Sequence, residues 1–322
     1  MIDPYETRLS RRELVLRLSS TGLVAGAVGV GALLFHDRRA QAAGLRPIPD
    51  WRVPGGGSLP EAAAAHGADP AANLRRAIEA VGGMGRFVKK GEVVVIKPNV
   101  GWDRLPEQAA NTDPQVVAEL VRLCRGAGAK RVVVTDNSCN DPRRCFARSG
   151  IAAAASQAGA EIVDGSAAVF VPASVSGYSS GIEVMEAVLL ADRVINVPVV
   201  KHHSLSRATL GMKNWMGVLG KGRNRLHQSI HRSVAELGAM FRPTLTVMDA
   251  TRILLANGPQ GGSLADVKTV GAVAVGTDAL ACEVWGAVQM GLQPASLGFI
   301  TEAAQRGIGR ADLALVKDLG SA

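Results

Sequence analysis

The chain has 322 residues, of which 47% are hydrophobic and only 4% aromatic, so it is long enough to bury a full core built mainly from Ala, Val and Leu. That composition suits helices packed on a parallel sheet. The formal net charge of +8, from 36 basic and 28 acidic residues, favours anionic partners. The basic residues are scattered and aromatic residues are few, which argues against a nucleic-acid-binding protein.

The first 42 residues have the pattern of an export signal. Residues 10–15 read SRRELV, an apolar stretch follows at residues 18–35, and residues 40–42 (AQA) offer a small-x-small cleavage pattern. We expect residues 1–42 to be a twin-arginine signal peptide, which would make the twin-arginine translocase a partner and the mature chain periplasmic or exported after cleavage near Ala42. An uncleaved membrane anchor is the alternative, because about 18 residues can just span a bilayer. The twin-arginine route carries folded proteins, often with a cofactor inserted, so the resemblance favours a cofactor.

Residues 43–68 are rich in Pro, Gly and Ala and are expected to form a linker or arm before an α/β domain at residues 69–322. Up to residue 200, periodicity and capping residues predict helices at 73–81, 115–126, 151–159 and 182–191, and strands at 92–97, 131–136, 161–164 and 194–200. A loop or hairpin arm is expected at 170–181. This alternation predicts a mostly parallel sheet with helices on both faces, either as one unit or as two α/β subdomains.

After residue 200, the pattern predicts strands at 243–249 and 270–275 and helices at 226–241, 279–290, 295–306 and 311–317. Several strands end in polar residues, among them Lys97, Asp136 and Asp249. Ligands bind at the carboxyl ends of strands in open α/β sheets, so we expect a site there.

Residues 193–231 contain four of the six histidines and several lysines, more groups able to bind a metal, an anion or a proton than any other segment. We expect four catalytic groups, Lys201, His202, Lys213 and His227. We expect the substrate to be bound by Lys97, Asn99, Asn111, Thr112, Asn214 and Gly217. A lysine near other cations could have a lowered pKa and act as a base or form an adduct.

Two kinds of site are compatible with these residues. A metal site would use His202, His227, His231 and Asp249. His227 and His231 are four residues apart and would share a helix face, while His202 is preferred to His203 because adjacent residues of an extended segment point in opposite directions. A cationic site for a carboxylate or phosphate would use Lys97, Lys201, Lys213, Lys221 and Arg223. Neither a Walker motif nor a Gly-x-Gly-x-x-Gly follows a strand, so the usual signatures of nucleotide binding are absent from the sequence.

Some of these motifs have simpler explanations. Residues 111–114 (NTDP) are typical of a helix N-cap, although the amides of a helix start could equally hold an anion, and Asp278 is expected to cap a helix. Cys139 and Cys145 could form a disulfide across a short loop or remain free, and Cys139 is a candidate nucleophile with no identified base. The four cysteines lack the spacing of a ferredoxin-type iron–sulfur motif.

With these motifs in order, the chain resembles the family called domain of unknown function 362 over about residues 92–290. The matching segments are short but keep their order and spacing: residues 96–99 (IKPN), 111–114 (NTDP), 195–198 (INVP) with Lys201 and His202, 211–214 (GMKN) with Gly217, His227, Asp249, 258–261 (GPQG) and 277–278 (TD). The resemblance implies an α/β fold and an association with ferredoxin-type iron–sulfur modules, hence a redox partner protein. The chain departs from that association because its sequence has no cysteine cluster.

A more distant similarity is to the lactate racemase family. In that family a lysine tethers a nickel pincer cofactor, and a histidine about one helix later ligates the nickel. Lys213 and His227 resemble this pair in order and approximate spacing.

We therefore expect an exported enzyme, of redox or isomerase type, that acts on a small anionic substrate with a metal or other cofactor at a Lys/His/Asp site. The alternative is a non-catalytic periplasmic protein that binds an anion or a metal.

Overall fold

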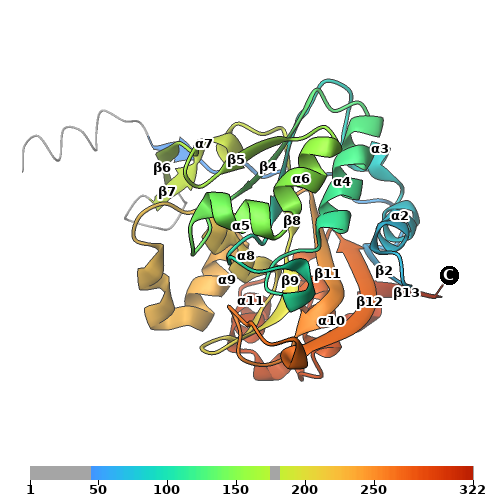
Figure 1. Cartoon of the computed structure of the whole chain (residues 1–322). Helices are drawn as coiled ribbons and strands as arrows, with labels where there is room; N and C mark the ends of the chain where they lie inside the picture. The colour runs from blue at the N-terminus through green and yellow to red at the C-terminus, as the bar shows by residue number, and fades with distance from the viewer. Residues whose placement is uncertain (1–44, 175–181, 322) are drawn as a thin grey trace, which may run out of the picture. The chain divides into compact units, whose positions relative to one another are not determined.

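Runs of Val, Ile and Ala form a ten-stranded sheet at the centre of the part of the chain that the structure describes, residues 45–174 and 182–321. In this computed structural model eight strands follow one another across the sheet (Figure 1). In spatial order they are β13 (Val316–Ser321), β2 (Ala62–His66), β12 (Val267–Gly276), β11 (Leu245–Leu254), β8 (Arg193–Val197), β3 (Val93–Pro98), β4 (Arg131–Asp136) and β5 (Glu161–Asp164). The predicted signal at residues 1–42 lies outside the described residues.

The sheet is mostly parallel, as the alternation of strands and helices predicted. All neighbours from β11 to β5 run parallel, while β12 pairs antiparallel with both β11 and β2. Strand β9 (Val199–His203) runs parallel to β11, and β10 (Arg207–Thr209) pairs antiparallel with β9. A separate three-stranded sheet contains β1 (Arg46–Pro47), β6 (Phe170–Ser174) and β7 (Ile182–Met185).

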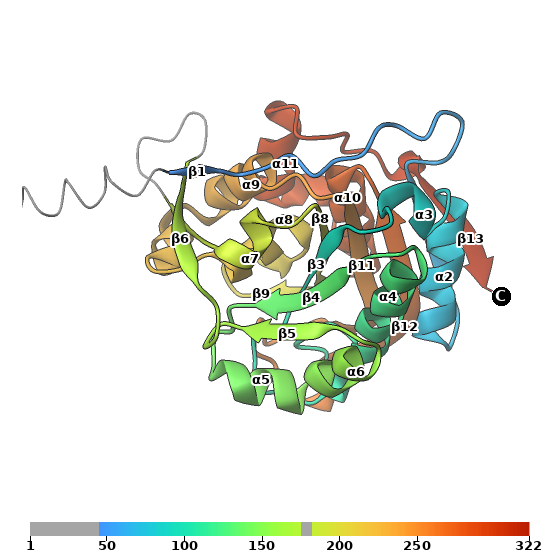
Figure 2. The ribbon, with the colours of Figure 1, turned by 90° about the horizontal axis from the view of Figure 1, so that it is seen from above.

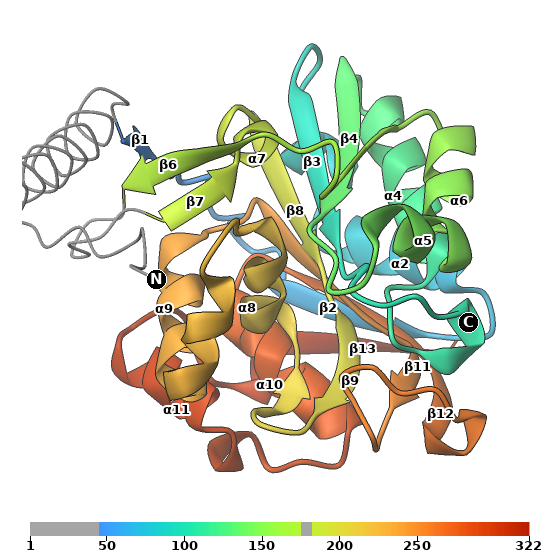
Figure 3. The ribbon, with the colours of Figure 1, turned by 60° about the vertical axis from the view of Figure 1, so that its left-hand side comes forward.

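Helices cover both faces of the large sheet, which also confirms the predicted architecture. One face packs against α2 (Pro70–Ala80), α4 (Pro114–Gly126) and α6 (Ile151–Gln157), and the other against α9 (Ile230–Met240), α10 (Ala279–Gln289) and α11 (Gly298–Gln305) (Figures 2 and 3). Along β3, Val94 and Ile96 belong to the hydrophobic core on the face covered by α2, α4 and α6. Val95 belongs to the core on the opposite face, which α9, α10 and α11 cover. Burial on both faces explains why the central strands are continuously apolar. The described residues from Arg46 onward form one compact unit, not two subdomains.

The predicted linker at residues 43–68 contains a strand of the large sheet. Residues 62–66 (AAAAH) form β2, whose four alanines are fully buried between β12 and β13. Alanine has low strand propensity, so a strand is not predicted here from the sequence, and tertiary packing decided the conformation. Trp51 is also buried, and its Nε1 donates to the Ala191 carbonyl at 3.0 Å, which holds this segment against the core.

Three other predicted elements differ from the structure. The helix expected at 182–191 is a strand, β7, followed by the short helix α7 (Glu186–Leu189), because β7 pairs with β6. The strand expected at 194–200 is divided into β8 and β9 at Pro198, which cannot donate a ladder hydrogen bond. The helix expected at 311–317 is a 3₁₀ turn followed by β13, which pairs with β2.

The helix expected at 226–241 is two elements. A 3₁₀ segment, Arg223–Ser229, precedes α9, and Ser229 between them has a non-helical φ of −135°. His227 therefore lies in the 3₁₀ segment and His231 in α9, so the two do not form one i, i+4 pair on a regular helix. Among the residues described, no helix has both the length and the apolar character to cross a bilayer.

Candidate functional site

A cavity of about 560 Å³ opens beyond the carboxyl ends of β3 and β4, where β9 and the segment from α8 (Gly211–Asn214) to residue 227 also meet. This is the edge of the sheet at which the sequence predicted a site. Its charged or titratable lining residues are Lys97, Asp136, Cys139, Lys201, His203, Lys213, Lys221, Arg223 and His227.

Lys97 is fully buried at the end of β3 and is held as an ammonium by three oxygen acceptors. Its Nζ lies 2.8 Å from Asp136 Oδ1, 2.8 Å from Asn214 Oδ1 and 2.7 Å from the Pro98 carbonyl oxygen. The Asp136 carboxylate at this distance favours the charged form of the amine. Burial lowers the pKa of Lys97, and the Asp136 carboxylate opposes that shift. We conclude that Lys97 is a structural cation that organises the floor of the cavity.

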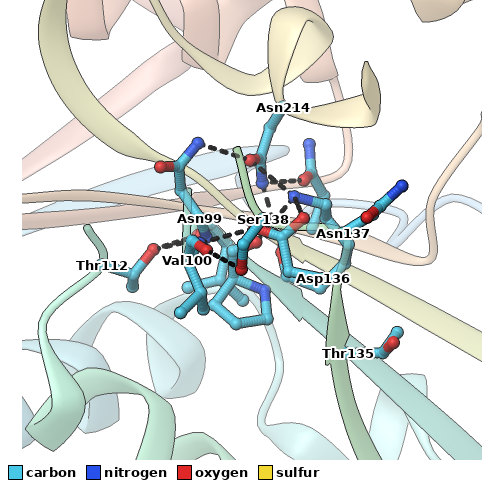
Figure 4. Close-up of polar contacts among 12 residues, drawn as sticks. Asn99, Val100, Thr112, Thr135, Asp136, Asn137, Ser138 and Asn214 are labelled. Carbon is cyan, nitrogen blue, oxygen red and sulfur yellow. Dashed lines mark hydrogen bonds and ion pairs between the residues drawn. The ribbon is translucent and has the colours of Figure 1, made fainter. Parts of the chain in front are cut away.

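Asn214 and Asn99, which Figure 4 shows facing each other, continue this network to Lys201. Asn214 Oδ1 also accepts from Asn99 Nδ2 at 3.0 Å, and Asn99 Oδ1 accepts from Lys201 Nζ at 2.9 Å. Asn214 Nδ2 donates to Asn196 Oδ1 at 2.9 Å, which joins α8 to the end of β8. The residues contributed by β3, β8, β9 and α8 are therefore fixed relative to one another.

Lys201 and Lys213 differ from Lys97 because neither has a carboxylate partner among the described residues. Lys201 is 1% exposed, and its Nζ donates to Asn99 and, at 2.5 Å, to the Ala110 carbonyl. Lys213 is 8% exposed, and among the described residues its Nζ has Met216 Sδ, at 3.6 Å, as its only partner. Burial lowers the pKa of Lys201 to about 7 and that of Lys213 to about 8. Both amines can therefore gain or lose a proton near neutral pH.

His203, and not His202, lines the cavity. Lys201 and His203 are two residues apart on β9 and so share a face, whereas His202 points the other way and its Nδ1 accepts from the Gly258 amide at 3.1 Å. The expectation from the sequence was His202, but the structure places His203 in the cavity lining beside Lys201. Burial, together with the nearby Lys213 charge, lowers the pKa of His203 to about 3.

The hydrogen bonds of His203 and His227 assign them opposite roles. Nδ1 of His203 accepts from the amides of Leu205 and Ser206 at 3.1 and 3.3 Å, so the ring proton is on Nε2 and this neutral ring is a donor. Nδ1 of His227 lies 3.2 Å from the Asn224 carbonyl oxygen, which can only accept, so Nε2 of His227 keeps a lone pair. Burial and Lys213 lower the pKa of His227. The two rings stack with centroids 6.0 Å apart.

The loop after α8 is fastened over the end of β4. The Asn137 amide donates to the Gly217 carbonyl at 2.7 Å, and Arg223 donates to the carbonyls of Asn137 and Ser138 at 2.5 and 2.8 Å. A Cβ at residue 217 would lie 1.9 Å from Asp136 Oδ1 and 2.6 Å from Lys97 Nζ. Only glycine therefore allows this loop to approach the Lys97–Asp136 ion pair.

The four expected metal ligands do not converge. Of these, only His227 lines the cavity. The His231 ring stacks on Phe299, with centroids 6.1 Å apart. Asp249 accepts from the amides of Asp113 and Thr251, at 2.7 and 2.9 Å. Across residues 45–174 and 182–321, no three His, Cys, Asp or Glu side chains are grouped so that they could hold a metal ion.

Asn111 and Thr112 support the site without lining the cavity. The Thr112 hydroxyl donates to the Val197 carbonyl at 2.7 Å and accepts from the Asn99 amide at 2.8 Å. Asn111 pairs with both backbone groups of Trp102. Asp113 caps α4 by accepting from the Gln115 amide, so residues 111–114 form the predicted N-cap. Asp278 caps α10 in the same way.

Two further titratable groups lie in or beside the site, and of these only Glu283 was not singled out in the sequence. Cys139 lines the cavity beside the lysines, and it and Cys145 are both free thiols, not a disulfide. Glu283 of α10 is fully buried, and its Oε1 accepts from the Met212 amide at 2.5 Å, at the start of the helix that carries Lys213. The feature of the sequence that could have identified Glu283 is its position as the single acidic residue in the apolar run ALACEVWGAV. Burial raises the pKa of Glu283 to about 8.

Comparison with known proteins agrees with the motifs in the sequence. Residues 94–288 match the family described as "Domain of unknown function (DUF362)". The chain belongs to this family. The match spans every residue that lines the cavity, from Lys97 to Pro259.

This DUF362 chain is similar to a curated protein and, more distantly, to a solved structure. It is 29% identical over 246 residues to the thylakoid-associated protein sll1697 of Synechocystis sp., and the alignment covers 74% of each chain. It is similar to the solved lactate racemase apoprotein of Thermoanaerobacterium thermosaccharolyticum, with 14% identity and a TM-score of 0.39. That likeness covers 70% of this chain and 55% of the racemase chain, so it is as distant as the sequence indicated.

The cysteines of this DUF362 chain do not fit an iron–sulfur cluster. Cys124, Cys145 and Cys282 are buried, and only Cys139 is exposed. Burial raises the pKa of the Cys124 thiol to about 12 and that of Cys145 to about 11, so both are protonated thiols in this structure.

Glu283 makes the stability of the fold depend on pH. Its pKa is about 8 in the fold and near 4.5 in the unfolded chain, so unfolding releases a proton between these values and stability falls as pH rises from 4.5 to 8. One such group contributes a slope of about 1.4 kcal/mol per pH unit. We expect Glu283→Gln to remove this contribution, measured as urea unfolding free energy across that pH range. The exposed Glu107→Gln should leave the wild-type slope, and equal slopes in all three proteins would refute the assignment.

Proposed function

We propose that this protein is an exported enzyme that binds a small anionic substrate in the cavity and transfers protons to and from it. The observation that carries the proposal is the pairing of two stacked histidines with opposite hydrogen-bonding roles beside two buried amines that titrate near neutral pH. Groups with pKa values near the working pH are those that general acid–base catalysis needs.

The charge of the cavity supports an anionic substrate. Five basic side chains line it, and Asp136, the one acid among its described lining residues, is engaged by Lys97. Lys221 and Arg223 add positive charge from the loop beyond α8. A carboxylate or phosphate entering this cavity would therefore meet ammonium and guanidinium donors without a competing free carboxylate.

The histidines support proton transfer over binding alone. A neutral Nε2–H of His203 can donate to a carbonyl or carboxyl oxygen of the substrate, while the Nε2 lone pair of His227 can accept a proton. A site selected only to bind an anion has no need for amines that lose their charge near pH 7 and 8. Because only one of the expected metal ligands lines the cavity, we assign the chemistry to the imidazoles and amines.

Affinity for a small dianion should fall as pH rises. Below pH 7 both Lys201 and Lys213 are ammonium groups, and above pH 8 both are neutral amines. We expect calorimetric titration with oxalate to show affinity falling by up to about tenfold per pH unit for each proton taken up on binding. Lys201→Met should remove the step near pH 7 and keep the step near pH 8. An affinity that is constant from pH 6 to pH 9 would exclude binding at these lysines.

Proton transfer can be followed by isotope exchange. In D₂O, we expect the protein to replace with deuterium the hydrogen on the carbon beside the carboxylate or carbonyl of at least one small 2-hydroxy or 2-oxo acid. Proton NMR measures this exchange as loss of the signal of that hydrogen. His227→Gln should slow this exchange by about 10²–10⁴-fold, the usual contribution of a general base. His231→Gln is the matched control because His231 packs on Phe299 outside the cavity lining. Binding of oxalate without exchange of any of these acids would leave only the non-catalytic anion-binding function.

We also propose that the chain is exported by the twin-arginine route, which rests on residues 10–42 of the sequence. In a bacterial host with this pathway, the periplasmic fraction should contain a mature chain that begins at Ala43. Arg11→Lys combined with Arg12→Lys should block its appearance, and Arg38→Lys should not. N-terminal sequencing and fractionation measure the outcome, and export of the double variant at the wild-type level would contradict the proposal.

A further inference from the structure

We propose that Lys213 forms a covalent imine with the carbonyl carbon of a small 2-oxo carboxylate, with the substrate's carboxylate held by the other cations of the cavity. This inference rests on the proposed function and names a substrate class and a covalent step for the same cavity.

Lys213 is distinguished from the other lysines of the cavity by its lack of an oxygen partner. Lys97 Nζ lies near three oxygen acceptors and Lys201 Nζ near two. Within residues 45–174 and 182–321, the sole partner of Lys213 Nζ is the weak acceptor Met216 Sδ. A buried amine without acceptors favours its neutral form, which is the nucleophile.

The position of Lys213 is fixed from both sides of α8. Glu283 accepts from the Met212 amide immediately before it, and the Asn214 side chain immediately after it is bound to Lys97, Asn99 and Asn196. The backbone on either side of Lys213 is therefore held, while its amine remains available to the cavity. Such an arrangement limits the entropy that the amine loses on reaction.

The surroundings of Lys213 suit a carbonyl that carries a neighbouring carboxylate. His203 is held as a neutral Nε2–H donor that can polarise a carbonyl oxygen, and His227 offers a lone pair. Arg223 and Lys221 remain as cations for the carboxylate, since Lys97 is paired with Asp136. Arg223 donates to two backbone carbonyls but forms no ion pair with a described residue, so a ketone or aldehyde without a carboxylate would leave its charge without a counter-ion.

The step balances without a redox reagent. The Nζ lone pair of Lys213 forms a bond to the carbonyl carbon as the carbonyl π pair moves to oxygen, which gives a carbinolamine after proton transfer. Loss of the oxygen with both amine protons as one water molecule then leaves the carbon–nitrogen double bond. The imine draws electrons from the adjacent carbon, and so eases removal of its proton by the lone pair of His227.

Reductive trapping with pyruvate tests the inference. Wild-type protein incubated with pyruvate and cyanoborohydride should gain the mass of pyruvic acid less one oxygen atom, once per chain, and peptide mapping should place the adduct on Lys213. Trapping should increase as pH rises toward the pKa of Lys213, near 8. Oxalate, which has a similar charge and no ketone or aldehyde carbonyl, should protect Lys213.

Matched variants separate this step from nonspecific modification. Lys213→Met should lose the adduct, and because Lys213 makes no ion pair with any described residue, its removal leaves no unpaired buried charge. Lys268→Met removes an exposed lysine outside the cavity lining and should trap pyruvate as the wild type does. Circular dichroism checks that both variants fold, and the wild-type peptide map gives the answer even if one does not.

Two results overturn the imine. In the first, oxalate binds with the expected pH dependence but no adduct forms on Lys213. This result would rule out the covalent step and leave the proposed function intact. In the second, the adduct forms on Lys201 or on surface lysines instead of Lys213. Absence of oxalate binding would overturn the proposed function as well, so the two failures are distinguishable.

Discussion

The buried ammonium of Lys97 is the interaction on which the rest of the cavity depends. It joins the Asp136 carboxylate at the end of β4, the Asn214 amide of α8 and the backbone of β3. Two charges taken out of water are costly unless they are paired and fully hydrogen-bonded, and removal of one partner typically costs about 3–5 kcal/mol. The requirement to satisfy this one ion pair therefore specifies the positions of three elements, and Gly217 is needed because any larger residue would intrude on it.

The ion pair of Asp136 with Lys97 determines the electrostatic character of the rest of the cavity. Lys201 and Lys213 form no ion pair with an acid among the described residues, so burial outweighs the opposing effect of Cys139 and brings their pKa values to about 7 and 8. The same unbalanced positive charge, together with burial, keeps His203 neutral. Because Asp136 is paired with Lys97, the cavity has an excess of positive charge that attracts anions, and it contains groups able to exchange protons.

Glu283 supports the cavity from the opposite side of α8. Its carboxyl contacts the amide of Met212, while Asn214 at the other end of this one-turn helix is bound to the sheet. A helix this short has little stability of its own, so its position depends on such tertiary anchors. The position of Lys213 therefore reflects contacts from α10 and from the strand ends, which are far apart in the sequence.

The sequence by itself determined the alternating α/β architecture, the family, and the edge of the sheet at which Lys97, Asn99, Asn214 and Gly217 gather, because apolar periodicity, capping residues and polar strand ends are local signals. It could not give β2, whose alanines become a strand only between two partners, or the break at Ser229 that separates His227 from His231. Only the tertiary structure decided which lysine has acceptors and which histidine faces the cavity. Those properties depend on the burial and the hydrogen-bond partners that distant segments provide.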